Sequence, residues 1–154
     1  MCYNNQDFMK KFERLLKGHK SLVFLDFEGT QFSHEMIAIG AMHVSIDRNG
    51  RIKKHKKPFR IYVKAHNRVG KIVTDLTGIT DEMLKQKGVS FFTAMSELKK
   101  YVGLSFRKSS FITFGSHDMK ILLLLSPIVL IFQKKQCKLF NKTILISRPL
   151  SLNS

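Results

Sequence analysis

The feature that most constrains the fold is a short apolar run that contains one acidic residue and is followed by another. Residues 21–27 read SLVFLDF and are apolar apart from Ser21 and Asp26. A run of this length, bounded by polar residues, is typical of a strand that is buried on both faces of a sheet. The sequence therefore predicts a central strand over Ser21 to Phe27, paired along both edges and covered by other elements.

The rest of the chain supplies the partners that such a strand needs. We predict further strands over 36–46, 59–63 and 110–114, and helices over 7–16, from Thr80 onward, over 90–102 and from Ser116 or His117. For the tail, one alternative is a buried helix followed by a strand over 143–147, and the other is that it does not continue the domain. Residues 51–57 hold five Lys or Arg in seven positions and are interpreted as a solvated hairpin arm rather than a phosphate contact. The segment between the third strand and Thr80 is expected to be a loop. This order predicts an α/β fold with a mixed sheet flanked by helices.

The charge balance indicates a class of partner but no chemistry. The 154 residues include 27 Lys or Arg against 11 Asp or Glu, a formal net charge of +16. Such an excess favours polyanions, because neutralised phosphates release their counterions, although an acidic membrane surface is attracted by the same field. Only Cys2 and Cys137 are present, so a reducing, cytoplasmic setting is expected. The apolar run 121–132 is shorter than the roughly 20 residues of a membrane span, and we expect no membrane association.

Two carboxylates lie near the end of the predicted central strand. Asp26 and Glu28 stand at i and i+2, so strand alternation places both on one face. Neighbouring carboxylates repel and lose hydration, and an Arg or Lys partner, a shared proton or metal ions could compensate. Asp118 follows another strand, where ligands gather in α/β sheets, and could complete an oxygen-rich metal site. The alternative for Asp118 alone is an ordinary helix N-cap.

Four sequence pieces together resemble the DEDDh 3′–5′ exonucleases, a family that includes ribonuclease T. In order and spacing they match over residues 20–122, as FLDFEGT (24–30), IGA (39–41), LTGIT (76–80) and FGSHD (114–118). The resemblance implies a ribonuclease H-like fold with a mixed five-stranded sheet. It also implies that Asp26, Glu28 and Asp118 are catalytic residues that hold two Mg²⁺ or Mn²⁺ ions.

The same resemblance implies where the substrate lies. Gly29 and Thr30 would lie close to the 3′ end of single-stranded DNA or RNA, with the Thr30 hydroxyl or N–H in reach of the terminal nucleotide. Thr77 and Gly78 would line the same pocket, although Leu76 and Ile79 are equally explained as core residues that support this loop. The resemblance also allows a homodimer.

The family pattern is incomplete in this chain. Its last helix carries a His that acts as general base and, five positions on, an Asp that is the fourth metal ligand, whereas residues 119–154 contain no His and no acid. His117 is a poor substitute, since it should point away from the target of its neighbour Asp118. The sequence therefore predicts that this last helix is missing.

Three explanations fit this gap: a frameshift near codon 120, a degenerate protein that binds nucleic acid without cutting it, or a second chain that supplies the helix. We favour the first and divide the chain into an exonuclease portion, 1–122, and an atypical tail, 123–154, that could be out of frame. Little or no turnover is then expected. The alternative from another class is a non-catalytic basic module that binds nucleic acid.

Overall fold

The computed structural model describes residues 19–49, 51–114, 121 and 143–146. The strands are β1 (Ser21–Gly29), β2 (Met36–Ile46), β3 (Ile52–His55), β4 (Phe59–Tyr62), β5 (Ser110–Phe114) and β6 (Thr143–Ile146). The helices are α2 (Lys71–Thr77), α3 (Asp81–Lys87), α4 (Phe91–Val102) and the 3₁₀ helix η1 (Gly103–Lys108). The helices predicted over 7–16 and from Ser116 or His117 lie outside the described residues, as does Asp118.

The sheet is mixed and β1 lies inside it. β1 pairs with β2 in antiparallel and with β5 in parallel orientation, and β6 continues the parallel side next to β5. β3 and β4 both pair with β2, at residues 44–46 and 38–41 respectively, so they act as one broken strand along its outer edge. Six strands thus occupy five positions, in the order β3-β2-β1-β5-β6 with β4 beside β2. The predicted α/β fold with a mixed sheet is confirmed.

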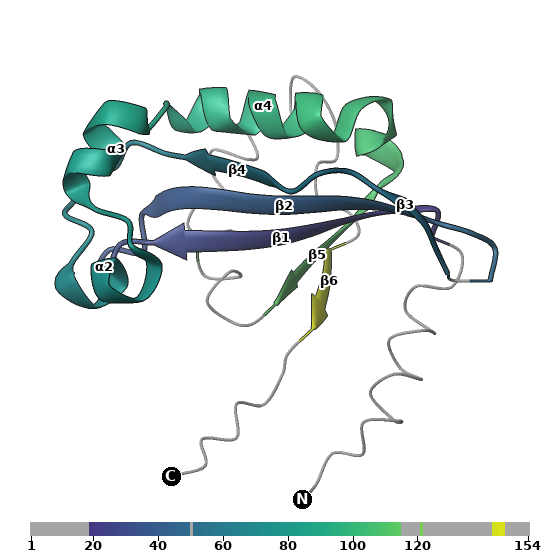
Figure 1. Cartoon of the computed structure of the whole chain (residues 1–154), viewed down its shortest axis with the longest axis horizontal. Helices are drawn as coiled ribbons and strands as arrows, with labels where there is room; N and C mark the ends of the chain where they lie inside the picture. The colour runs from purple at the N-terminus through teal and green to yellow at the C-terminus, as the bar shows by residue number, and fades with distance from the viewer. Residues whose placement is uncertain (1–18, 50, 115–120, 122–142, 147–154) are drawn as a thin grey trace, which may run out of the picture.

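Helix α4 covers one face of this sheet (Figure 1). Every fourth residue of the helix from Ala94 onward is apolar and buried, namely Ala94, Leu98 and Val102. These residues pack in one core cluster with the inward residues of β1, which are Val23, Leu25 and Phe27. The helix begins where the sequence predicts, because Ser90 caps it by accepting a hydrogen bond from the Thr93 N–H. Thr80 caps α3 in the same way through the Met83 N–H.

The segment expected to be a loop before Thr80 is instead partly helical. α2 begins after Gly70 without a side-chain cap, so its sequence lacks the start signal that predicts a helix. None of its seven residues is buried. It ends at Gly78, whose φ of 72° is left-handed. The η1 turn after α4 was likewise not predicted.

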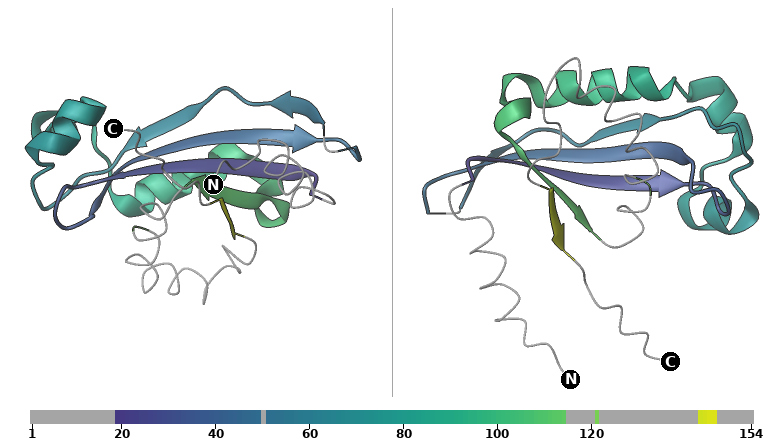
Figure 2. Two further views of the ribbon diagram at one scale, coloured as in Figure 1. Left: turned by 90° about the horizontal axis from the view of Figure 1, so that it is seen from below. Right: turned by 180° about the vertical axis from the view of Figure 1, so that it is seen from behind.

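The two ends of the sheet have different surroundings. α2 and α3 lie at the end where β1 finishes, and β3 lies at the opposite end, as Figures 1 and 2 show from three sides. All four residues of β3 are exposed, which confirms the solvated basic arm. Among the described helices, none has the length and apolar content to cross a membrane.

A buried polar cluster lies beneath the start of β1. His43 Nε2 and Ser21 Oγ are hydrogen-bonded at 2.7 Å, and Ser21 Oγ is a further 2.7 Å from Ser109 Oγ. The Tyr101 hydroxyl accepts from the His43 N–H. Burial of the ring, and then the positive charge of Lys56, lower the pKa of His43 below its ordinary value of 6.5. Both effects favour the neutral imidazole in the folded chain.

We expect this histidine to make the fold sensitive to mild acid. The pKa of His43 is lowered on folding, so the unfolded chain binds more protons than the folded chain below pH 6.5. The contribution of His43 to the free energy of unfolding is therefore complete above pH 6.5. It is lost as the pH falls towards the lower pKa of the folded state. The urea midpoint of the wild type should therefore fall from about pH 7.5 to about pH 5.5. His43→Gln should show a smaller fall, and equal falls in both proteins would contradict the assignment.

Candidate active site

Asp26 and Glu28 share the face of β1 that points away from α4. Strand alternation puts them on the side opposite Val23, Leu25 and Phe27, which enter the core under the helix. Asp26 is exposed and Glu28 is half-buried. Two carboxylates in a strand that is otherwise buried are thus presented together near its C-terminal end, as the i, i+2 spacing predicts.

Gly40 of β2 lies directly across from Asp26 and leaves its carboxylate open. A Cβ at Gly40 would lie 3.6 Å from the Asp26 Cβ and 3.9 Å from Asp26 Oδ2. Because Gly40 has no side chain, nothing from this position of β2 stands beside the carboxylate. The sequence signal was available, because a glycine inside a strand often marks a place that another group must approach closely, but Gly40 was not predicted as a site residue.

The donor set at this strand end suits a hard divalent cation. Carboxylate oxygens are the ligands that Mg²⁺ and Mn²⁺ prefer, and the bare backbone at Gly40 leaves room beside one of them. Within the described ranges no three His, Cys, Asp or Glu side chains gather closely enough to hold a metal ion. The third expected ligand, Asp118, lies outside those ranges. The roles of Asp26, Glu28 and Asp118 in catalysis and metal binding therefore stay predictions.

Ile121 brings the segment that follows β5 back to the end of β1. Its side chain is fully buried in the same cluster as Phe27. A Cβ at Gly29 would lie only 3.0 Å from Ile121 Cδ1, so the two residues are in close contact. Ile121 follows Asp118 by three residues in the sequence. The glycine next to Glu28 is thus a packing requirement as well as a predicted substrate contact.

Thr30 is built into a tight turn rather than presented to solvent. It is 1% exposed, and its N–H donates to the Glu35 carbonyl at 2.9 Å. Its hydroxyl shares a 2.6 Å hydrogen bond with Ser33 Oγ and accepts from the Glu35 N–H at 3.0 Å. A direct contact between Thr30 and a nucleotide stays a prediction, and it requires these bonds to open.

Thr77 and Gly78 form the C-terminal end of α2. The Thr77 hydroxyl donates to the Val73 carbonyl at 2.7 Å and accepts from the Ile79 N–H. A Cβ at Gly78 would meet no atom within 4 Å, so this backbone faces open space. Ile79 is fully buried, in agreement with the core interpretation, whereas Leu76 is 81% exposed and disagrees with it.

Glu35 ties the Thr30 turn to a distant segment, and its sequence neighbourhood did not mark it as a site residue. Its carboxylate accepts hydrogen bonds from the backbone N–H groups of His66 and Asn67, at 2.8 and 3.0 Å. The Asn67 side-chain amide donates a third, at 3.2 Å. No local pattern signals a contact between residues 31 positions apart in the sequence, so only the fold reveals it.

Comparison with known proteins gives a family and a fold. The family model described as exonuclease, of RNase T type, matches residues 23–147. That range contains Asp118 and continues into the segment assigned to the tail, whose boundary at residue 122 stays a prediction. None of the curated protein sequences compared with the chain matches it.

Two solved structures share the architecture. A full-length 3′-exonuclease superposes with a TM-score of 0.53 and 19% identity over 80% of this chain and 49% of its own. Cell-death related nuclease 4 (CRN-4) superposes with a TM-score of 0.51 and 19% identity, over 82% of this chain and 52% of its own. The chain spans about half the length of these structures, and the likeness at this identity is one of fold.

Gly29→Ala should destabilise the fold because the added Cβ would lie 3.0 Å from Ile121 Cδ1 and 3.4 Å from the His34 backbone. Overpacking of this kind costs about 1–3 kcal/mol. Ile121→Val removes Cδ1, so the double variant should lose less stability in urea than the two single variants together. Gly40→Ala is the matched control, with its nearest neighbour at 3.6 Å, and should lose little. Strictly additive losses would contradict this packing.

Proposed function

Because this chain belongs to the exonuclease family of RNase T type, we propose that it removes nucleotides from the 3′ end of single-stranded nucleic acid by metal-dependent hydrolysis. The observation that carries the proposal is the pair of carboxylates at the end of β1, with Asp26 exposed and Gly40 opposite it leaving space. DNA and RNA are both candidate substrates.

Asp26, Glu28 and Asp118 are the residues we assign to hold two Mg²⁺ or Mn²⁺ ions. Such ions, when bound, activate the attacking water and stabilise the leaving oxygen. Chain connectivity supports the inclusion of Asp118. β5 runs parallel to β1 with Thr113 beside Leu25, and Ile121 contacts Gly29. Asp118 is four residues from the end of β5 and three residues from Ile121. Even a fully extended chain therefore keeps it within about 14 Å of the end of β5 and within about 11 Å of Ile121.

The surface around this strand end supports a single-stranded substrate. Three apolar side chains are unusually exposed there: Phe32 (83%), Ile72 (58%) and Leu76 (81%). The turn that carries Phe32 is joined to α2, since the Ile72 N–H donates to Gln31 Oε1 at 3.3 Å. An unpaired base can stack on the aromatic ring of Phe32, Ile72 and Leu76 offer apolar contacts beside it, and a net charge of +16 attracts the phosphates. The proposed contacts at Gly29, Thr30, Thr77 and Gly78 border this surface.

We also propose that this chain cuts slowly on its own. Residues 119–154 contain no His, Asp or Glu, so no side chain there can act as general base or as fourth carboxylate ligand. His43 is no substitute, because its ring lies on the α4 face and is hydrogen-bonded to Ser21. Loss of general-base catalysis alone lowers a rate by about 10²–10⁴-fold.

The proposal is tested with a 5′-labelled single-stranded oligonucleotide and excess protein in Mn²⁺. We expect a faint ladder of products shortened from the 3′ end in single-nucleotide steps, abolished by EDTA and by Asp26→Ala. Without a side-chain base the rate should rise with hydroxide concentration, about tenfold per pH unit.

Glu97→Ala is the matched control, because it removes an exposed carboxylate of α4 that pairs with Lys100. It should leave the ladder unchanged. Two results would contradict the account: internal cuts that Asp26→Ala does not affect would exclude the proposed site, and rapid trimming whose rate does not follow hydroxide concentration would show that a general base is present. Metal-independent binding without any cleavage would favour the non-catalytic alternative.

A further inference from the structure

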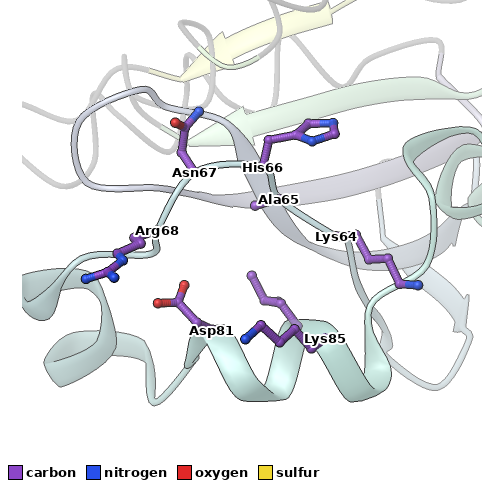
Figure 3. A pocket seen from close by; sticks show the side chains of 8 residues that line it. Lys64, Ala65, His66, Asn67, Arg68, Asp81 and Lys85 are labelled. Carbon is purple, nitrogen blue, oxygen red and sulfur yellow. The ribbon is translucent and has the colours of Figure 1, made fainter.

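A basic pocket of about 370 Å³ lies between the segment that follows β4 and helix α3. Figure 3 shows the side chains of residues 64–68 along one side and those of the helix along the other. The polar and charged residues that line it are Lys64, His66, Asn67, Arg68, Asp81 and Lys85. All six are exposed, so the pocket is open to solvent along its length.

The charges of this pocket are unbalanced. Lys64, Arg68 and Lys85 bring three permanent positive charges against the single carboxylate of Asp81. Asp81 Oδ1 already accepts a hydrogen bond from the Val69 N–H at 2.9 Å. No carboxylate in the described part of the chain forms an ion pair with any of the three cations. The pocket therefore offers unneutralised donors to an anion.

The segment that carries these donors is fixed by its backbone. At one end the Lys64 N–H donates to the Val89 carbonyl, at 2.9 Å. In the middle Glu35 holds the N–H groups of His66 and Asn67. At the other end the Val69 carbonyl accepts from the Gln31 N–H, also at 2.9 Å. The cationic side chains thus extend from a preorganised backbone, which lowers the entropy that binding must overcome.

The pocket is connected to the proposed active site by two residues. Thr30, which follows Glu28 by two positions, exchanges two hydrogen bonds with the backbone of Glu35. The carboxylate of Glu35 in turn holds the segment lining the pocket. The connection between β1 and β2, which contains both residues, lies at the end of the sheet where β1 finishes, close to α2 and α3 (Figure 1).

We propose that this pocket binds an internal phosphodiester of the nucleic acid strand whose 3′ end lies at Asp26 and Glu28. The inference rests on the proposed function only for the position of that 3′ end. An open groove with a net excess of two positive charges suits a phosphate that passes along a chain, whereas an enclosed site would suit a free anion. Arg68 supplies a planar pair of donors for phosphate oxygens, and Lys64 and Lys85 supply point charges.

The test compares two charge-matched double variants of the full chain. Arg68→Gln/Lys85→Gln removes two charges from the pocket. Arg51→Gln/Lys54→Gln removes two from the exposed arm at the opposite end of the sheet. Binding of a labelled ten-nucleotide single strand is followed by fluorescence anisotropy in EDTA. The pocket variant should bind about 3–10-fold more weakly, and its salt dependence should be shallower by about 0.7 for each phosphate that is no longer neutralised. The arm variant should change much less.

A set of strands, each with one neutral methylphosphonate linkage at a different position, then identifies the phosphate that the pocket binds. One internal position should weaken binding to the wild type and have no further effect on the pocket variant. The proposal is overturned if the two double variants lose equal affinity or if no linkage shows this coupling. Because no cleavage is needed, the pocket and the nuclease activity can fail separately.

Discussion

The pairing of β1 along both of its edges is the constraint on which the rest of the structure depends. The antiparallel partner β2 places Gly40 across from Asp26, and the parallel partner β5 finishes beside the same strand end. The inward residues of β1 are occupied by the core under α4, so its carboxylates can only point to the other face. The positions of Asp26 and Glu28, and their exposure to solvent, thus follow from the way in which β1 is paired and packed.

Local signals account for most of the fold that could be predicted. The apolar run of β1 and the hydroxyl caps at Thr80 and Ser90 each act within a few residues, so the sequence alone reveals them. Helix α2 carries no such signal at its start, because it begins after Gly70 without a side-chain cap. The hydrophobic periodicity alone predicts an α/β fold with a mixed sheet, and several folds share that description. The family resemblance led to the correct one.

The candidate site could be predicted only in part, because its surroundings depend on contacts between distant residues. The i, i+2 spacing of Asp26 and Glu28 was sufficient to place them on one face. It did not reveal that Thr30 is sealed in a turn by Glu35, or that Glu35 also holds the segment at His66. Such hydrogen bonds form only after the sheet has brought both segments together. They join the turn that follows β1 to the segment that lines the basic pocket.

The central claim, that Asp118 joins Asp26 and Glu28 in binding divalent ions, is tested most directly by paramagnetic broadening of amide NMR signals with substoichiometric Mn²⁺. The account predicts that the signals of Glu28, Gly40 and Asp118 broaden together, while those of the arm at Lys54 stay sharp. Asp118→Asn should weaken this broadening at Glu28 and Gly40. Broadening centred elsewhere, or broadening at the end of β1 that is unchanged in Asp118→Asn, would contradict the shared site.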